Sequence, residues 1–393
     1  MDRLAARIKL KDSHFITKMA DIASSLPDVI AMGRGDPDLD TPSHIIKAGQ
    51  NALDNGATHY THPLGIKPLR EAIAADIKMT GGADYSPDNI VVTPGGQQGM
   101  FVIALALLDP GDEIIIPMPG YNPYHQAAEL AGAKISPVRT SLDTNFALNS
   151  NMVREKISPR SKILVLMNPN NPTGTITPPE EVKRIAEIAC EHDLIVISDE
   201  IYSKLTFENN FVQPMAVLPG MFERTITLSG FSKAYAMTGW RVGYFAGPND
   251  LIPALAEINH AFAISTAAVS QHAALEALTG PQDCVERMRD IYFDRAKVIC
   301  DGLDAMGIPY ADPQGGFYVY ANVGSFGITA TKFCETLLRE GQVLIYPGSI
   351  YGDYTDDFVR ISLTQNTCNL REAISRMKRV MNDLLFRKEI YVG

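Results

Sequence analysis

Short apolar runs alternate with longer amphipathic stretches through the middle of this chain. The apolar runs have the length of strands and cover residues 89–93, 113–117, 133–138, 162–167, 194–198, 224–229 and 242–247. Between several of them, apolar residues recur at the spacing of a helix, as in 97–108, 123–130 and 179–191. This alternation predicts βα units built around a largely parallel sheet that is buried on both faces.

The helix predicted over 179–191 carries the clearest local signals. Thr177 is the predicted N-cap, Pro178 and Pro179 follow it, and Glu180 and Glu181 place negative charge in the first turn. Proline is favoured at the start of a helix, and carboxylates there interact favourably with the helix dipole.

The pattern changes after Gly280. A charged helix is predicted over 282–306, aromatic strands within 310–323, a helix over 331–340, a strand over 358–363 and a closing helix over 370–386. We therefore expect an N-terminal arm over 1–45 that joins the small domain, a large domain over 46–285, and a small α+β domain over 286–393.

The composition excludes several classes of protein. Among 393 residues, 35 basic and 45 acidic side chains give a net charge of −10, which argues against a general nucleic-acid or anionic-membrane surface. The longest apolar run, 100–108, is about half of the ~20 residues that a membrane span needs, and the N-terminus lacks the apolar core of a signal peptide. The five cysteines show no spacing suited to zinc, so we expect reduced thiols and no metal site. These features indicate a cytoplasmic enzyme.

Ligands of open parallel sheets bind at the carboxyl ends of the strands, and the segment TPGGQQG at 93–99 follows one strand and opens a helix. Gly95 and Gly96 allow a ligand to approach the backbone, and the free N–H groups of a helix N-terminus attract phosphate. The segment matches neither GxxxxGK[ST] nor GxGxxG, and on its own a plain strand-to-helix turn explains it equally well.

Three asparagines follow the strand predicted over 162–167, in the segment NPNNPTG at 168–174. Two X-Pro bonds favour extended backbone and place the amides at the carboxyl edge of the sheet. A ligand-binding loop is the favoured interpretation, and a rigid solvent-facing turn is the alternative.

Asp199 ends the apolar strand predicted over 194–198, within the segment SDEIY. A carboxylate in a buried crevice must be paired or hydrogen-bonded, and a protonated ring nitrogen would be one such partner. Capping of a helix N-terminus explains Asp199 equally well.

Two further segments carry isolated cations. Lys233 lies in a Gly/Ser-rich loop after the strand predicted over 224–229, where a lysine that loses its proton can bond an aldehyde. Arg241 follows in the same loop and could fork onto a phosphate, while Arg360 stands among strand-like residues and could pair with a carboxylate. For a lone lysine, a solvated surface charge is the usual alternative.

Taken in order, these motifs resemble the class I/II aminotransferases, which are fold-type-I pyridoxal phosphate enzymes. The matching segments are HYTHPLGIKPLREAIA at 59–74, VVTPGGQQ at 91–98, LDPGDEIIIPMPGYNPY at 108–124, NNPTG at 170–174, SDEIY at 198–202, SGFSKAYAMTGWRVGY at 229–244 and FVRIS at 358–362. The resemblance extends from about residue 26 to the end. It implies an α/β fold with a three-layer large domain, a mostly parallel seven-stranded sheet and a smaller α+β domain.

The resemblance also implies roles for individual residues. Lys233 would form the internal aldimine with pyridoxal 5′-phosphate and then move the proton between the substrate Cα and the cofactor C4′. Asp199 would keep the pyridine nitrogen protonated. Asn171 and Tyr202 would hydrogen-bond the 3-oxygen of the ring, and Tyr121 would stack on its face.

The phosphate of the cofactor would lie at the N-terminus of the helix that opens at Gly96. The residues implied there are Gly95, Gly96, Gln97 and Arg241, with Ser229 and Ser232 as further hydroxyl candidates. Many relatives carry serine three residues before the lysine, where this chain has Gly230. Tyr60 matches a tyrosine that reaches the phosphate of the neighbouring subunit, which implies a homodimer with shared active sites.

At the substrate end, Arg360 would bind the α-carboxylate with help from Asn171 and the backbone of Gly35. Arg34 stands where many relatives have a small or apolar residue. It would either pair with a distal carboxylate of the substrate or form a structural ion pair with Asp36, Asp38 or another carboxylate.

The implied reaction is ping-pong transfer of an amino group from an L-amino acid to a 2-oxo acid, both small molecules. A C–S β-lyase or another pyridoxal reaction is the alternative on the same scaffold. A pyridoxal-binding regulatory protein is disfavoured, because only about 25 residues precede the matched region and leave no room for a basic DNA-binding extension.

Overall fold

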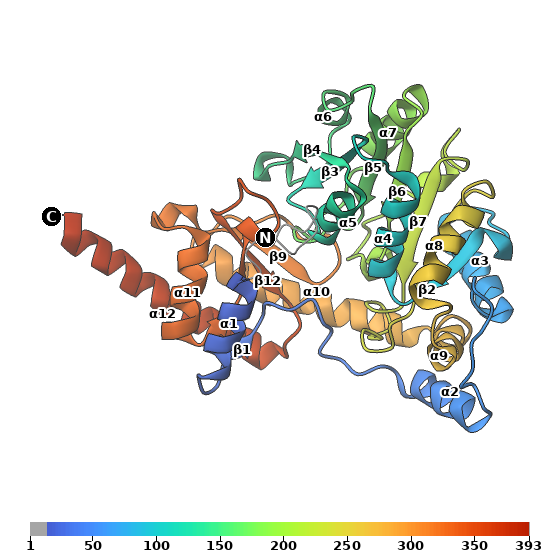
Figure 1. Ribbon diagram of the computed structural model, residues 1–393. Helices are drawn as coiled ribbons and strands as arrows, with labels where there is room; N and C mark the ends of the chain where they lie inside the picture. The colour runs from blue at the N-terminus through green and yellow to red at the C-terminus, as the bar shows by residue number, and fades with distance from the viewer. Residues whose placement is uncertain (1–13, 393) are drawn as a thin grey trace, which may run out of the picture.

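The computed structural model describes residues 14–392 and contains a large sheet of seven strands (Figure 1). In spatial order the strands are β2 (Ile90–Thr93), β8 (Gly243–Ala246), β7 (Thr225–Gly230), β6 (Ile195–Asp199), β5 (Ser161–Met167), β3 (Glu113–Met118) and β4 (Lys134–Arg139). Within this sheet β8 runs antiparallel to β2 and β7, and the other neighbouring strands are parallel. Every strand begins and ends within one residue of its predicted bounds, so the expected sheet is confirmed.

Helices cover both faces of this sheet. On one face lie α4 (Gly96–Leu107), α5 (Pro123–Ala131) and α8 (Ile252–Ala263), and on the other lie α6 (Ser150–Arg154) and α7 (Pro179–Glu191). Strand β3 shows how alternation builds these layers: Ile114 and Ile116 are buried with α4 and α5, whereas Ile115 is buried with α7. Beyond the β2 edge, α2 (Ser43–Asp54), α3 (Lys67–Gly81) and α9 (Ala268–Thr279) pack together.

Helix α7 has the predicted bounds but not the predicted cap. Its N-cap is Pro178, and the Thr177 side chain caps nothing, so that prediction is wrong. Thr177 lies one residue before the N-cap, and its backbone N–H donates to Asn168 Oδ1 at 2.9 Å. In the first turn, Glu181 accepts a hydrogen bond from the backbone N–H of Ser150 at 2.7 Å and so ties α7 to α6.

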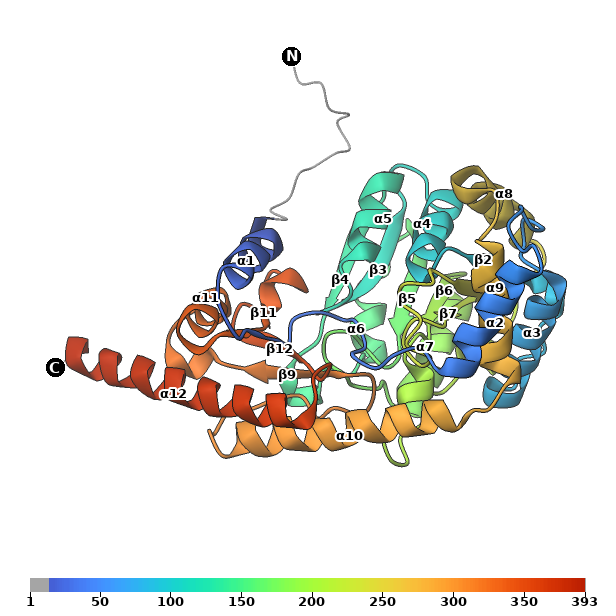
Figure 2. The same cartoon turned by 90° about the horizontal axis from the view of Figure 1, so that it is seen from below.

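A second, antiparallel sheet has the order β11 (Tyr346–Pro347), β12 (Phe358–Ser362) and β9 (Tyr318–Asn322). Of the strands predicted within 310–323, residues 318–322 form β9, and Tyr310 makes an isolated bridge to Ala321. The N-terminal arm joins this region, because β1 (Ile30–Ala31) pairs with β10 (Val343–Leu344). Helix α10 (Asp283–Asp304) runs beneath both sheets (Figure 2). The proposed boundaries at residues 45 and 285 stay predictions.

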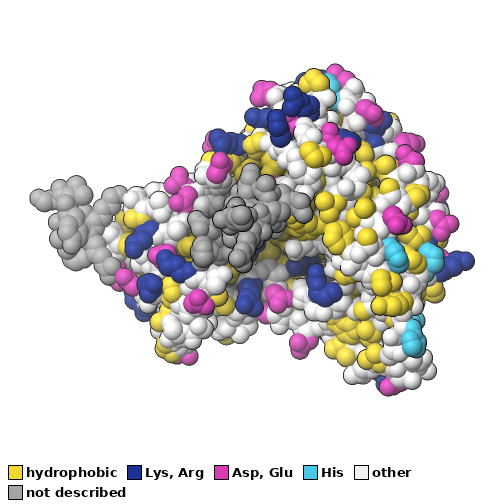
Figure 3. All heavy atoms as spheres, viewed as in Figure 1, with side chains coloured by type: hydrophobic (Ala, Val, Ile, Leu, Met, Phe, Trp, Pro, Cys, Tyr) yellow, Lys and Arg dark blue, Asp and Glu magenta, His cyan; other side chains and the backbone are white. Residues whose placement is uncertain are grey.

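One face of the molecule carries many apolar side chains over α4, α5 and α8 (Figure 3). The large apolar residues exposed on these three helices are Leu105, Leu130 and Phe262, and Ile264 follows directly after α8. The backbone N–H of Thr61 donates to Ser265 Oγ at 3.2 Å, so the loop that contains Tyr60 lies beside the end of α8.

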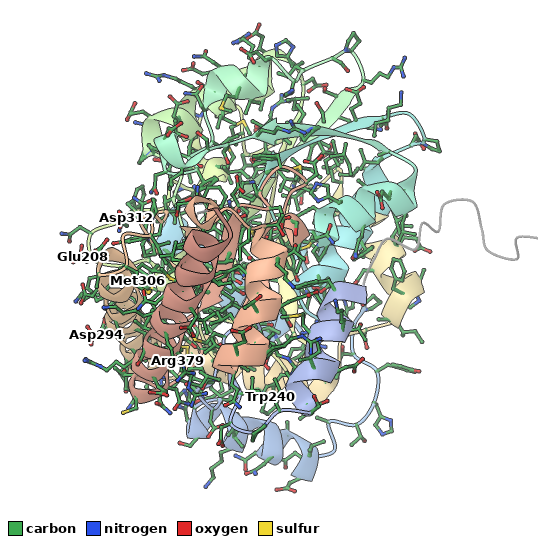
Figure 4. All side chains as sticks on the ribbon, turned by 90° about the vertical axis from the view of Figure 1, so that its left-hand side faces the viewer. Glu208, Trp240, Asp294, Met306, Asp312 and Arg379 are labelled. Carbon is green, nitrogen blue, oxygen red and sulfur yellow. The ribbon has the colours of Figure 1, made fainter. Side chains whose placement is uncertain are left out.

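On the outer face of the small region, α1 (His14–Ser24), α11 (Ala330–Gly341) and α12 (Thr367–Val392) lie side by side (Figure 4). From β1 the chain crosses toward α2, and this crossing segment carries Gly33, Gly35 and Asp36 to the space between the two sheets. Trp240, labelled in Figure 4, anchors the segment because its indole N–H donates to Thr41 Oγ1 at 3.1 Å. In residues 14–392, no helix is long and apolar enough to cross a membrane.

Candidate active site

A cavity of about 690 Å³ opens at the carboxyl ends of the parallel strands, between the large and small sheets. Most residues singled out in the sequence line it: Gly35, Gly96, Gln97, Tyr121, Asn171, Asp199, Tyr202, Ser229, Ser232, Lys233, Arg241 and Arg360. Residues far apart along the chain meet here because parallel strands end at one edge of the sheet. Among the described residues, no group of three or more His, Cys, Asp or Glu side chains could hold a metal ion.

Asp199 ends β6 and is fully buried. The Tyr124 hydroxyl donates to its Oδ2 at 2.7 Å, and the backbone N–H of Ile201 donates to its Oδ1 at 3.2 Å. Burial raises the pKa of this carboxyl to about 6, and the hydrogen bond from Tyr124 opposes that rise. The carboxylate is therefore held in one orientation at the edge of the cavity.

Lys233 lies in the loop between β7 and β8 and extends its amine into the cavity. The Nζ atom donates to the backbone oxygen of Gly35 at 2.6 Å. Burial lowers the pKa of this amine to about 8, although the charge of Asp36 opposes the shift. A neutral, nucleophilic amine is therefore accessible close to neutral pH.

The three asparagines of the 168–174 segment have different roles. Asn171 is 3% exposed and lines the cavity. Asn168 accepts from the Thr177 N–H, and Asn170 Nδ2 donates to the Pro119 oxygen at 3.2 Å, so both hold the loop in place. Only one of the three amides faces the cavity.

Two tyrosines line the same cavity from different elements. Tyr202 is buried, and its hydroxyl donates to the Tyr318 hydroxyl at 3.3 Å. Tyr121 precedes α5, and its hydroxyl donates to Gln97 Oε1 at 3.4 Å. Burial raises the pKa of Tyr121 to about 12 and that of Tyr202 well above its usual value, so both hydroxyls keep their protons near neutral pH.

The N-terminus of α4 and Arg241 form another wall of the cavity. Gly95 has a φ of +83°, and a Cβ atom there would lie 2.5 Å from Arg241 Nη2. Arg241 itself has a φ of 51°, and its Nη1 donates to the Thr238 oxygen at 3.0 Å. A backbone in the left-handed region at both residues thus brings the guanidinium against the glycine turn.

The two candidate serines differ in orientation. The Ser229 hydroxyl donates to the Glu200 oxygen at 3.4 Å and also lines a smaller cavity of about 210 Å³ with Thr227 and Tyr244. Ser232 is buried and lines the main cavity next to Lys233. At Gly230, a Cβ atom would lie 2.9 Å from Gly243 Cα, so the close approach of β7 and β8 explains the absence of serine there.

Arg360, in the centre of β12, is 6% exposed and strongly held. Its Nη1 donates to Asn171 Oδ1 at 3.0 Å, and its Nη2 donates to the Gly33 oxygen at 2.6 Å. The guanidinium carbon lies 4.2 Å from the ring centre of Tyr318 and 4.7 Å from that of Tyr351.

Comparison with known proteins identifies the family. The family model described as "Aminotransferase class I and II" matches residues 27–377. The chain belongs to this family. It is 38% identical to an aspartate aminotransferase of Pyrococcus abyssi over 97% of this chain and 98% of that one. It is 35% identical to aromatic-amino-acid aminotransferase 2 of Thermococcus litoralis, with the same coverage of both chains.

Solved structures confirm the fold expected from the resemblance. The aspartate aminotransferase of Thermus thermophilus with maleate superposes with a TM-score of 0.91 at 36% identity, covering 97% of this chain and 100% of that one. The three-layer α/β architecture with a small antiparallel sheet is therefore shared with an aminotransferase.

Three residues that the family resemblance singled out are not among those that line the cavity: Gly95, which directly precedes the lining residue Gly96, and Tyr60 and Arg34. Tyr60 is 76% exposed, and Arg34 is also exposed. Neither carboxylate named as a partner for Arg34 takes that role: Asp38 pairs with Arg295 at 2.6 Å, and Asp36 accepts from the Thr238 hydroxyl at 2.7 Å. Within the described part of the chain, no ion pair includes Arg34.

Sequence reasoning missed several tyrosines of this aminotransferase site. Tyr124 contacts Asp199, and Tyr318, Tyr346 and Tyr351 line the substrate end. Tyr124 stands only three residues after Tyr121, in the first turn of α5, and this closeness to a predicted site residue could have pointed to it. The other three come from the small sheet and its loops, where no motif marked them.

Proposed function

We propose that this chain is a pyridoxal 5′-phosphate-dependent aminotransferase that moves an amino group from an L-amino acid to a 2-oxo acid. The observation that carries the proposal is the pairing, in one cavity, of a buried carboxylate, Asp199, with a lysine of lowered pKa, Lys233. The reaction is ping-pong: the first product leaves before the second substrate binds, and Lys233 would hold the cofactor before the donor binds and again after the second product has left.

The residues of the cavity fit this cofactor. At one end, the buried Asp199 carboxylate suits a protonated ring nitrogen. At the other, Gly95 and Gly96 open α4 beside the Arg241 guanidinium and leave no room for a Cβ at residue 95, as a phosphate cradle requires. When bound, pyridoxal 5′-phosphate supplies an aldehyde that takes the amino group and a ring that accepts the electron pair released at the substrate Cα.

Asp199 holds the proton on the pyridine nitrogen. Tyr124 and the N–H of Ile201 each donate to one oxygen of the carboxylate and fix its direction, and each oxygen keeps an acceptor position for the ring N–H. Asn171 and Tyr202 donate hydrogen bonds to the 3-oxygen of the ring. Asn171 can do so because its Oδ1 is occupied by Arg360, which orients the amide and leaves Nδ2 to donate.

Lys233 moves the proton of the reaction. With the cofactor and substrate bound, its amine would take the proton from the substrate Cα and would give it to the cofactor at C4′. A pKa of about 8 suits both steps, because the amine is a base strong enough to accept this proton and an acid strong enough to give it back. The hydrogen bond to the Gly35 oxygen keeps the amine in the cavity meanwhile.

Arg360 binds the α-carboxylate of the substrate, assisted by Asn171 and the backbone of Gly35. The guanidinium is held by hydrogen bonds through Nη1 and Nη2 before any substrate arrives, while its buried Nε has no hydrogen-bond partner among the described residues. A planar cation fixed in this way is suited to a carboxylate, and little side-chain entropy remains to be lost on binding.

We infer a homodimer in which Tyr60 completes the phosphate end of the partner's cavity. Tyr60 is 76% exposed, and its loop is linked to the end of α8 next to the exposed Phe262 and Ile264. An apolar face of this kind favours association. The homodimer also explains why the side chain of Tyr60 is so largely exposed in the single chain.

The donor class follows from the substrate end of the cavity. Ile16, Tyr346, Ile350 and Tyr351 line it, and the described lining contains no lysine or arginine beyond Lys233, Arg241 and Arg360, whose roles are assigned above. We therefore propose neutral aromatic or apolar amino acids as preferred donors. The names of the relatives leave both options open, since they include aspartate and aromatic aminotransferases.

A panel of amino donors tests the proposal. Each is mixed with the purified holoenzyme in the absence of a 2-oxo acid, and conversion of the bound cofactor to its pyridoxamine form is followed by absorbance. We expect conversion by aromatic and apolar L-amino acids and weaker conversion by aspartate. Failure of every donor would contradict aminotransferase activity. Release of pyruvate and ammonia from an S-substituted cysteine would instead support the C–S β-lyase alternative.

A further inference from the structure

Tyr318 stands where the groups assigned to the cofactor meet the groups assigned to the substrate. It is the first residue of β9, is 2% exposed and lines the cavity. The aromatic ring faces Arg360, and the hydroxyl contacts Tyr202. One side chain thus touches both halves of the site through different atoms.

The ring of Tyr318 forms one side of the pocket that holds the Arg360 guanidinium. In the small sheet, Arg360 pairs with Tyr320 and Ser362 pairs with Tyr318, so Tyr318 and Arg360 are diagonal neighbours on one face. The guanidinium carbon lies 4.2 Å from the Tyr318 ring centre, a distance at which the ring face attracts a cation. Together with the bonds to Asn171 and Gly33, this contact fixes the plane in which Arg360 receives a carboxylate.

The hydroxyl of Tyr318 is tied to the cofactor side. It accepts a hydrogen bond from Tyr202 at 3.3 Å, and a Cβ atom at Gly35 would collide with it. Gly35 is the residue whose backbone oxygen holds Lys233. The absence of a side chain at residue 35 is therefore what allows the Tyr318 hydroxyl to reach Tyr202.

The surroundings of Tyr318 allow its hydroxyl to be removed without changing any charge. The titratable side chains that face it are Tyr121, Tyr202, Tyr292, Tyr351 and Arg360. Burial raises the pKa of each of these tyrosines, so Arg360 is the one charged member of the set near neutral pH. Any effect of removing the hydroxyl therefore reports the loss of a hydrogen bond and not the loss of a charge.

We propose that Tyr318 is a positioning residue that couples carboxylate recognition by Arg360 to the hydrogen bond from Tyr202 to the 3-oxygen of the cofactor. The ring orients Arg360. When the Tyr202 O–H donates to the 3-oxygen, the contact between the two hydroxyls reverses: the Tyr318 O–H donates to the Tyr202 oxygen and so orients it. The inference rests on the proposed function, because the roles of Arg360 and Tyr202 come from it. The two parts of the side chain predict two separable defects.

Three variants of the holoenzyme test this division. Tyr318→Phe keeps the ring and removes the hydroxyl, Tyr318→Leu removes both, and Tyr351→Phe removes a hydroxyl from the other ring beside Arg360. Two quantities are measured: the pH midpoint of the visible absorbance change of the bound cofactor without substrate, and the KM for the amino donor. The first reports the 3-oxygen, and the second reports Arg360.

For Tyr318→Phe we expect the midpoint to rise by about 0.4–1 pH unit with little change in KM, because one hydrogen bond behind Tyr202 is lost. For Tyr318→Leu we expect the same rise together with a KM increased roughly three- to thirtyfold, because the contact with the guanidinium is also lost. Tyr351→Phe leaves the midpoint unchanged. Thermal melting of each holoenzyme verifies that it is folded, and Tyr318→Phe alone suffices if the leucine variant does not fold.

An unchanged midpoint in Tyr318→Phe overturns the proposal, as does an equal shift in Tyr351→Phe, which would mark a general disturbance of the cavity. A folded Tyr318→Leu with an unchanged KM overturns the part that concerns Arg360. These outcomes differ from failure of the proposed function, in which the unmodified holoenzyme itself converts no donor.

Discussion

The two ends of the cavity are built in contrasting ways. At the end where we propose that the pyridine ring binds (the pyridine end), Asp199 is fully buried, and its carboxylate already accepts hydrogen bonds from Tyr124 and Ile201. At the end proposed for the phosphate (the phosphate end), Arg241 is exposed and Tyr60 is 76% exposed. One end is complete within a single chain, and the other is open to its surroundings.

This contrast suggests that the two ends of the cavity have different functions in the proposed mechanism. A buried, pre-oriented charge acts strongly on the electron pair of the reaction, because no water screens it. An open, cationic rim with a helix N-terminus mainly provides affinity for an anion and can be completed by a second subunit. Changes at the pyridine end should therefore affect catalysis, and changes at the phosphate end should affect cofactor binding.

Removal of the Asp199 carboxylate is expected to have the largest effect. In Asp199→Ala, kcat should fall by about 10²–10³-fold, the range typical for loss of a preorganised electrostatic group, while part of the cofactor stays bound. Tyr124→Phe, which keeps the carboxylate and removes one of its partners, should show a much smaller loss. Steady-state kinetics and cofactor titration of both variants measure this, and near-normal turnover of Asp199→Ala would contradict the role of Asp199.

Hybrid dimers test whether the phosphate end is shared. Lys233→Ala and Tyr60→Phe chains are each expected to be strongly impaired. In a mixed dimer, the site that keeps Lys233 receives Tyr60 from the partner and is free of both lesions. Activity that appears on mixing, dissociating and reassociating the two chains would support the shared site. Activity no greater than the residual level of the two parents would show that Tyr60 acts within its own chain or not at all.

The two serines provide a matched pair at the phosphate end. Ser232→Ala should weaken cofactor binding by roughly 10–100-fold, the cost of a hydrogen bond to a charged group, with little change in kcat at saturating cofactor. Ser229→Ala should change the cofactor Kd far less, because the Ser229 hydroxyl donates to Glu200. Equal losses in both variants would show that orientation does not distinguish them.

Arg34 is expected to show the smallest effect. Since it is exposed and lies outside the cavity lining, Arg34→Met should leave the ratio of kcat/KM for acidic and neutral donors unchanged. A selective loss of activity with aspartate or glutamate would restore the distal-carboxylate role that the sequence left open and would contradict the neutral donor class.

The parts of the molecule that follow from local rules were predictable from the sequence. The strands of the large sheet were, because short apolar runs mark them. In β3, for example, Ile114 and Ile116 face one layer of helices and Ile115 faces the other. The cavity residues that lie in family motifs were predictable as well, because the carboxyl ends of parallel strands meet at one edge of the sheet.

Contacts between distant segments were not predictable. The predicted Thr177 cap is wrong because the helix begins after Pro178, and the Thr177 N–H donates to Asn168 Oδ1 outside the helix. The contact between Tyr318 and Arg360 depends on the register of two antiparallel strands, which no local pattern encodes. The ion pair of Asp38 likewise goes to Arg295, far along the chain.

The attachment site of the cofactor tests the central claim most directly. The holoenzyme is reduced with borohydride, digested, and mapped for the peptide that carries the pyridoxyl group. The account predicts the label on Lys233, in the loop between β7 and β8. A label on any other lysine, or no label on a holoenzyme that retains its cofactor, would contradict it.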